Sequence, residues 1–244
     1  VLDYYNPIVG HTTYNFRDPR RVQTHGRVWR ITHEQGELLT PPKIVGEPIP
    51  ALLELLLSPE WRTRYFARHE LQQRSPRRVR SAVRRWVGDD ERRALEVLWV
   101  LQGVGSEDEK LLNRVLESGN PELRGAGLRV LRFQQAELRE AKVRGILNRM
   151  IVDENPRVRL EALVTTSHHA DHVAALRIAE RVLEKPLDDG LIYAAKETFH
   201  YFDQAGVSLP AAVVDFLVKY ESDERLVSRE LSDSVANEIL KRNT

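Results

Sequence analysis

The sequence contains no cysteine among its 244 residues. This absence excludes disulfides, thiolate metal sites, iron–sulfur clusters, thiol catalysis and covalent attachment of a c-type haem. No apolar run approaches the 18 residues that a membrane-spanning helix requires, and the apolar run at 51–57 is too short and too interior for a signal peptide. The sequence also lacks a glycine-rich phosphate loop, a nucleophile elbow and a paired-histidine metalloprotease motif. With an apolar share of 41 %, these absences indicate a globular protein and nothing more specific.

The charges are balanced overall but uneven along the chain. There are 37 basic and 36 acidic side chains, which give a formal net charge of +1. Residues 51–88 carry nine arginines against three glutamates, whereas residues 161–244 carry nine basic and fifteen acidic side chains. A nucleic-acid-binding protein of this size is usually more basic as a whole, so the balance argues against nucleic acid as the partner.

The first fifty residues differ from the rest of the chain. They hold six prolines and four glycines, a density that prevents long helices. The alternating segment 26–32 is predicted to be a strand that pairs, at most, with part of 12–16 or 36–39. We therefore divide the chain into 1–48, a β or irregular segment with a linker, and 49–244, a helical domain.

From Ile49 onward the apolar residues recur with the 3.6-residue period of a helix. The segment Asn120-Pro121-Glu122-Leu123-Arg124 recurs as Asn155-Pro156-Arg157-Val158-Arg159. The first helix of each repeat carries a small residue at the same position, and we expect this residue to let the two helices of a hairpin approach closely. These residues are Ala67, Val97, Gly127, Ala162 and Ala194. Second helices are predicted near 76–87, 107–118, 137–152, 170–184 and 210–220. A repeat of this length predicts a HEAT-like α-solenoid of about five helical hairpins, and the alternative is a non-repetitive helical bundle.

Three N-terminal blocks, 3–11, 16–21 and 25–32, resemble the end of a β-propeller. Together with helical motifs such as Trp61-x-x-Arg64-x-x-Ala67-Arg68-x-x-Leu71 and 94–103, they are similar to the membrane-bound dehydrogenase family of planctomycete-type bacteria. The resemblance covers roughly residues 3–200. In that family a sugar- or sorbosone-dehydrogenase-like propeller is followed by HEAT-like repeats and often by a c-type cytochrome segment.

The resemblance implies that the chain is a middle piece of an exported or periplasmic protein. The bulk of the propeller, with any residue that holds a quinone or the sugar, is absent, and so is the haem-attachment motif. A quinone and a c-type haem are therefore expected of the parent protein and not of this chain. We expect a non-catalytic scaffold whose partner is another protein or the rest of its own parent chain.

One group of residues has metal-ligand spacing. His168 and His172 lie four residues apart and could face one ion from a helix, with Asp171 as a third ligand. The group also falls at an expected inter-helix turn, where polar residues collect to cap helices. Helix capping is the preferred interpretation there, as it is for Asp188.

The arginine-rich helix at 76–87 provides the candidate partner-binding residues. Arg77, Arg80 and Arg84 share one helical face, which could meet an acidic protein, a phosphate backbone or a haem propionate. The alternative is a solvated outer face paired to nearby acids.

Two other functions remain open from the sequence. One is a helical-repeat nucleic-acid-binding protein, or a DNA glycosylase-like enzyme, that uses the basic region 62–85. The other is a HEAT-like lyase or chaperone acting on a tetrapyrrole-bearing partner. Three tryptophans could serve as stacking platforms for bases, but burial in the core is the preferred interpretation: Trp61, Trp86 and Trp99.

Overall fold

The computed structural model describes residues 2–3, 24, 27–29, 31, 36 and 40–221. The chain divides into two compact units, residues 1–42 and residues 43–244. The expected propeller blocks fall largely on residues 4–23, which lie outside the described residues.

The first unit contains a minimal antiparallel ladder. Strand β1 (Leu2–Asp3) pairs with β2 (Arg27–Val28), and Leu2 lies opposite Val28. Strand formation around 27–28 was predicted, but the described partner is residues 2–3 and not 12–16 or 36–39. Val28 and Ile31 are 81 % and 82 % exposed, so the described part of this ladder contributes little to a core.

The second unit is helical. Its described part contains eleven α-helices and two short 3-10 turns: α1 (Ile49–Leu55), α2 (Trp61–Gln72), α3 (Pro76–Trp86), α4 (Glu91–Gly103), α5 (Glu109–Leu116), α6 (Pro121–Gln134), η1 (Gln135–Glu137), α7 (Glu140–Met150), α8 (Pro156–Thr166), α9 (His172–Glu180), η2 (Arg181–Glu184), α10 (Asp189–Gln204) and α11 (Ala211–Glu221). These helices confirm the predicted mostly-α fold.

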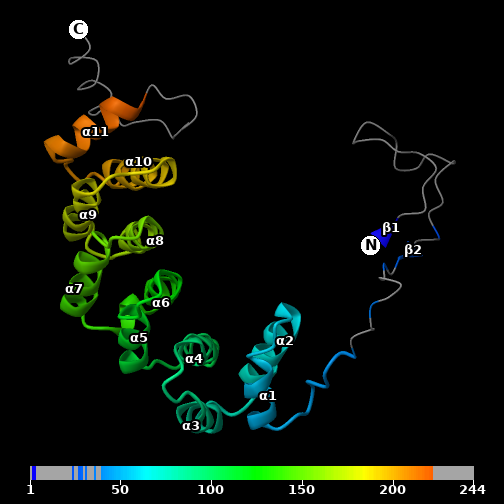
Figure 1. The fold of residues 1–244 in the computed structure, drawn as a ribbon. Coiled ribbons are helices and arrows are strands. Elements are labelled where there is room, and N and C mark those ends of the chain that lie inside the picture. The colour runs from blue at the N-terminus through cyan, green and yellow to red at the C-terminus, as the bar shows by residue number, and fades with distance from the viewer. Residues whose placement is uncertain are drawn as a thin grey trace. The chain divides into compact units, whose positions relative to one another are not determined.

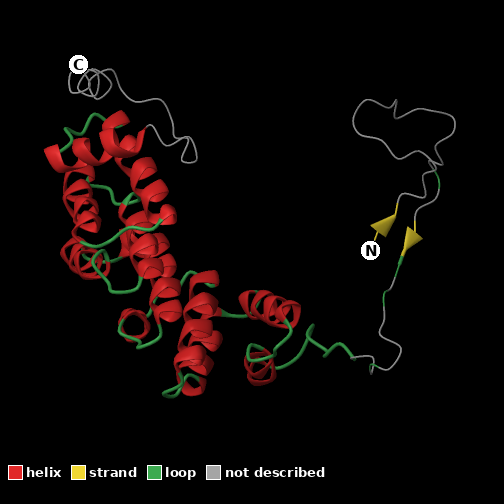
Figure 2. Ribbon diagram, turned by 45° about the horizontal axis from the view of Figure 1, so that its top comes forward, coloured by secondary structure: helices red, strands yellow, loops and turns green. Residues whose placement is uncertain are grey.

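The helices form two layers that follow the chain in alternation. In the inner layer α2 packs on α4, α4 on α6, α6 on α8 and α8 on α10. The outer layer contains α1, α3, α5, α7 and α9, each of which contacts an inner-layer helix next to it in sequence. Within this unit the inner layer lines the concave side of the curved stack (Figure 1), and Figure 2 shows the same succession of helices from a second direction. This arrangement is the predicted HEAT-like solenoid.

Each inner-layer helix begins at a residue whose side chain caps it. The carboxylate or amide oxygens of Glu60, Asp90, Asn120, Asn155 and Asp188 accept a hydrogen bond from a backbone N–H of the first turn. Capping satisfies one of the four N–H groups that a helix start leaves without a partner. The repeated Asn-Pro pair is such a start, with proline at the first helical position, where no N–H is needed.

Two of these helices end at a glycine in the left-handed region. Gly105 after α4 and Gly206 after α10 have φ of 62° and 77°. The next N–H closes each turn, since Ser106 N donates to Leu101 O and Val207 N donates to Phe202 O. Glycine adopts this conformation without a steric penalty, so the sharp reversal toward the outer layer occurs there.

The capping residues give the repeat register directly. Ala67, Val97, Gly127 and Ala162 each lie seven residues after the N-cap of their helix, as predicted, and each is buried. The predicted fifth member, Ala194, is wrong by one residue. Ala195 is the seventh residue after Asp188 and is fully buried, whereas Ala194 is only half-buried.

Candidate protein-interaction surface

Three inner-layer helices each contain an arginine that binds the turn preceding the helix. Arg64, Arg124 and Arg159 each lie four residues after the N-cap, and the Nη1 of each donates to two successive carbonyl oxygens of that turn. For Arg64 these bonds are 2.7 Å to Ser58 O and 2.8 Å to Pro59 O. The repeat thus fixes the start of α2, α6 and α8 in the same way.

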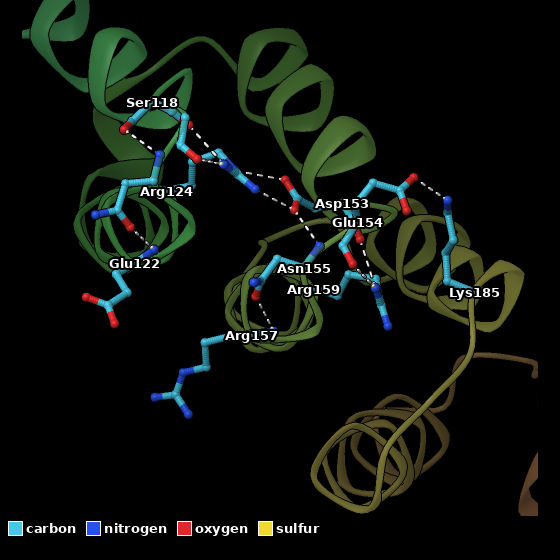
Figure 3. A network of polar contacts seen from close by, with 11 residues as sticks. Ser118, Glu122, Arg124, Asp153, Glu154, Asn155, Arg157, Arg159 and Lys185 are labelled. Atoms are coloured by element: carbon cyan, nitrogen blue, oxygen red, sulfur yellow. Dashed lines mark hydrogen bonds and ion pairs between the residues drawn. The ribbon is translucent and has the colours of Figure 1, made fainter.

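Two of these arginines also connect neighbouring repeats. Arg124 reaches the carboxylate of Asp153 (Figure 3). Arg159 Nη2 donates to Pro186 O at 2.6 Å. Asp153 and Pro186 both lie two residues before the N-cap of the next inner-layer helix. These contacts set the spacing of α6, α8 and α10, and with it the spacing of the side chains on the concave face.

Two buried carboxylates lie between successive inner-layer helices. Glu96 on α4 is paired with Arg68 on α2 at 3.0 Å, and Glu161 on α8 is paired with Arg129 on α6 at 2.6 Å. Burial raises the pKa of Glu96, although the Arg68 guanidinium opposes this rise. The hydrogen bond to Glu161 raises the pKa of Arg129.

The pair on α8 leaves an excess of positive charge. Glu161 also lies 3.2 Å from Arg132 and 3.4 Å from Arg157, so three guanidinium groups surround one carboxylate. Arg129 and Arg157 keep half or more of their side-chain surface exposed. This part of the inner layer therefore presents cations to solvent.

Exposed aromatic residues of the described helices all lie on the inner layer: Trp61, Tyr65 and Phe66 on α2, Phe133 on α6, and Tyr193 and Tyr201 on α10. Four of them recur at equivalent positions. Tyr65 and Tyr193 are each the fifth residue after the N-cap, and Phe133 and Tyr201 are each the thirteenth. Position 5 lies opposite the buried position 7 on a 3.6-residue helix, so Tyr65 and Tyr193 face away from the outer layer, toward the concave side. Tyr201, at position 13, contacts His172 of α9 in the outer layer, with its hydroxyl 3.2 Å from His172 Nε2.

A small cleft opens among these residues between α2 and α4. It has a volume of about 280 Å³ and is lined by Tyr65, Arg68, His69, Gln72 and Trp99. The Arg68 guanidinium carbon lies 5.1 Å from the centre of the Trp99 ring, while its Nε donates to Glu96. The arginine is therefore held by an ion pair and a cation–π contact.

Sequence reasoning missed this aromatic face. Trp61 was expected in the core and is 60 % exposed, and Tyr65 of the same helix is 49 % exposed. The buried stripe of α2 is Thr63, Ala67 and Leu71. The sequence did contain a signal for this face. The aromatic residues lie outside the stripe of small and aliphatic residues that the helix buries.

The three predicted partner-binding arginines have different surroundings along α3. Arg77 lines a groove beside α1, and Arg84 lines a groove beside α5 together with Glu107, Asp108 and Glu109. Arg80 lies between them and donates to the hydroxyl of Ser106.

The basic region 62–85 does not form one surface either. Its first arginines belong to α2 in the inner layer and its last ones to α3 in the outer layer. Arg64, Arg68 and Arg74 are engaged with backbone carbonyls or glutamates. The positive charge that is concentrated in this part of the sequence is thus distributed over two layers of the structure.

The side chains of the predicted metal-binding group, His168, Asp171 and His172, each contact a different residue. Asp171 caps α9 by accepting from Ala174 N at 3.0 Å, and this hydrogen bond lowers its pKa. His168 Nδ1 lies 2.9 Å from Val164 O, and His172 Nε2 lies 3.2 Å from the Tyr201 hydroxyl. Among the described residues no three potential metal-ligating side chains are gathered at one point.

Comparisons with known proteins add little to this geometry. No family model and no curated protein matches the chain. Two crystal structures of engineered proteins from the Northeast Structural Genomics Consortium are similar over 80 % of this chain, with 14 % and 16 % identity, TM-scores of 0.42 and 0.41, and 96 % and 94 % of their own chains covered. In the described part of the chain, no helix has the length and hydrophobicity to span a membrane.

Proposed function

We propose that this chain is a helical-repeat scaffold that binds an extended segment of a partner protein along its inner layer. The observation that carries the proposal is the placement of the exposed aromatic residues. All six lie on inner-layer helices, and four of them recur at equivalent repeat positions. Large exposed aromatic side chains that line one face are typical of interaction sites.

The chemistry of the face supports a segment with both apolar and acidic side chains. Arg62, Arg92, Arg129 and Arg157 are exposed on the same layer as the aromatic rings, and the nearby carboxylates Glu96 and Glu161 are buried. Aromatic and arginine side chains dominate the binding energy of protein interfaces. Acidic residues of a partner would meet guanidinium groups there, and apolar residues would pack on the rings.

The same proposal extends to the protein from which the chain derives. On the resemblance described above, the scaffold would belong to an exported dehydrogenase-like protein and would hold a redox propeller against a downstream acceptor. The chain has no cysteine for a c-type haem, so the residues present do not fit that group. The gene sequence on either side of Val1–Thr244 tests this extension, which fails if no propeller is encoded upstream.

Selection of binding peptides tests the interaction function. The full chain would be immobilised and used to select 12-residue peptides from a random phage-displayed library. We expect the selected peptides to combine apolar and acidic residues and to lose about tenfold or more in affinity for a Tyr65→Ser/Phe133→Ser variant.

A matched control is available on the other layer. Val173 on α9 is 53 % exposed, so Val173→Ser removes exposed apolar surface of the outer layer only. Affinity should stay within about twofold in this variant. The proposal is wrong if the selected peptides respond to Val173→Ser and not to the inner-layer changes, or if no peptide is selected.

A further inference from the structure

A second groove lies on the outer side of the solenoid, between the start of α1 and α3. It has a volume of about 690 Å³. One wall is the chain 46–50, and the other is formed by residues of α3 and the turn before it, including Arg77, Arg78 and Arg85. None of these residues belongs to the inner-layer surface described above, so the groove is a separate site.

The charge in this groove is not compensated within the described chain. No carboxylate of the described residues lies within ion-pair distance of Arg77, Arg78 or Arg85, and Arg85 donates only to the Ser81 hydroxyl, at 2.7 Å. The one acidic residue of the lining, Glu47, is paired with Lys43 at 3.0 Å. Three exposed guanidinium groups thus line one groove with no ion-pair partner among the described residues.

The other side of α3 shows that this imbalance is local. Arg84 lines a groove that also contains Glu107, Asp108 and Glu109, so acidic residues accompany the arginine there. Arg77 and Arg78 lie in the first turn of α3, which carries no acidic residue. Cations are unfavourable at the positive end of a helix dipole, so the fields of the helix and of the arginines add together. An anionic partner in this groove would relieve that repulsion.

The rest of the lining indicates what kind of anion fits. Pro48, Ile49, Pro50 and Ala82 place apolar surface beside the arginines. A helix of 11 residues is about 16 Å long, which matches four or five residues of an extended peptide. A nucleic-acid backbone would gain nothing from the apolar surface and would be expected to contact a longer basic track.

We propose that this groove binds an acidic segment of a partner protein, with two or three carboxylates within about five residues and an apolar residue among them. The carboxylates pair with Arg77, Arg78 and Arg85, whose planar guanidinium groups can each donate two parallel hydrogen bonds. The apolar residue packs against Ile49 and Pro50. The site is independent of the inner-layer surface.

Fluorescence anisotropy with the full chain tests the proposal. The probe is a fluorescein-labelled peptide of sequence Ser-Glu-Leu-Asp-Glu-Ser, and the comparison peptide carries glutamine and asparagine in place of the acids. We expect saturable binding of the acidic peptide only. A variant with Arg77→Gln, Arg78→Gln and Arg85→Gln should bind it at least about tenfold more weakly.

The control is Arg84→Gln, which removes an arginine of the same helix from the other groove and should change affinity by less than about twofold. Tyr65→Ser/Phe133→Ser should also leave this binding unchanged, which separates the groove from the inner-layer function. The proposal is overturned if the triple variant binds as well as the unchanged chain, or if Arg84→Gln weakens binding equally. Tighter binding of a fluorescein-labelled oligothymidylate of equal charge would overturn it in favour of nucleic acid.

Discussion

Arg124 of α6 forms a two-pronged ion pair with Asp153, which precedes α8. Its Nε lies 2.9 Å from Asp153 Oδ2 and its Nη2 lies 2.8 Å from Oδ1. The remaining nitrogen, Nη1, donates to the carbonyls of Ser118 and Gly119 at the start of its own helix. One side chain therefore joins the turns of two consecutive repeats, and little of either partner is exposed.

Replacing Arg124 should reveal how much this link stabilises the solenoid. Arg124→Lys keeps the charge but cannot make the forked contact and the two carbonyl hydrogen bonds together. We expect the free energy of unfolding to fall by about 1.5–3 kcal/mol in urea denaturation. Arg144→Lys alters an exposed pair with Glu140 on α7 and should cost about 0.5 kcal/mol or less. Equal effects of the two changes would contradict the role given to Arg124.

Gly127 is a second test of packing between the layers. A Cβ atom at this position would lie 3.1 Å from both Val115 Cγ1 and Leu116 Cδ2 of α5. Gly127→Leu should therefore destabilise by about 1–3 kcal/mol through overpacking, measured by chemical denaturation. A Cβ atom at Gly145 in α7 would meet no atom within 4 Å, so Gly145→Ala should stabilise the protein by about 0.5–1 kcal/mol. A stable Gly127→Leu protein would show that the contact between α5 and α6 is looser than described.

The corrected register predicts how neighbouring alanines respond. Ala162→Leu and Ala195→Leu should each cost about 1–3 kcal/mol, because both residues are fully buried at the same repeat position. Ala194→Leu should cost clearly less, because Ala194 is half-buried. Thermal melting of the three variants decides between the registers: a larger loss for Ala194→Leu than for Ala195→Leu would restore the sequence-based assignment.

The buried Glu96 should make stability depend on pH in an unusual direction. Burial raises its pKa in the folded state, so between the unfolded and folded pKa values the folded protein binds more protons than the unfolded chain. Lowering the pH through this window should stabilise the unchanged protein relative to Glu96→Gln, which does not titrate. Urea denaturation at a series of pH values between 7 and 4 measures the difference.

Glu60 provides a control of opposite sign. The hydrogen bond from Thr63 N lowers its pKa, so the unfolded chain binds the proton more readily. Relative to Glu60→Gln, the unchanged protein should lose stability as the pH falls below the pKa that Glu60 has in the unfolded chain. If both variants gave the same sign, the buried environment of Glu96 would not be the cause.

The repeat could be predicted because its signals are local. Asn120-Pro121 and Asn155-Pro156 act through hydrogen bonds and backbone angles within one helical turn, so the sequence indicates where those helices begin. The period of the apolar residues likewise predicts which face of each helix is buried. The shift from Ala195 to Ala194 arose because no such marker pair precedes α10, whose start is the aspartate Asp188.

The surfaces could not be predicted in the same way. Whether an arginine is neutralised depends on residues distant in the chain: Glu107 and Asp108 line the groove of Arg84, whereas the one acidic residue in the groove of Arg78, Glu47, is paired with Lys43. Whether an aromatic residue is exposed depends on the neighbouring layer, which leaves Phe133 70 % exposed in the middle of the solenoid. Local patterns do not report either relationship.

The sequence by itself determined the helical period, the helix starts and the stripe of small and aliphatic residues that the helices bury, because these follow from backbone hydrogen bonding and from the removal of apolar side chains from water. The tertiary structure alone decided which helices share a layer, which ion pairs cross between repeats and which charges stay without a partner. These depend on distances between residues about 30 positions apart, such as Arg124 and Asp153, and such distances exist only once the repeats have stacked.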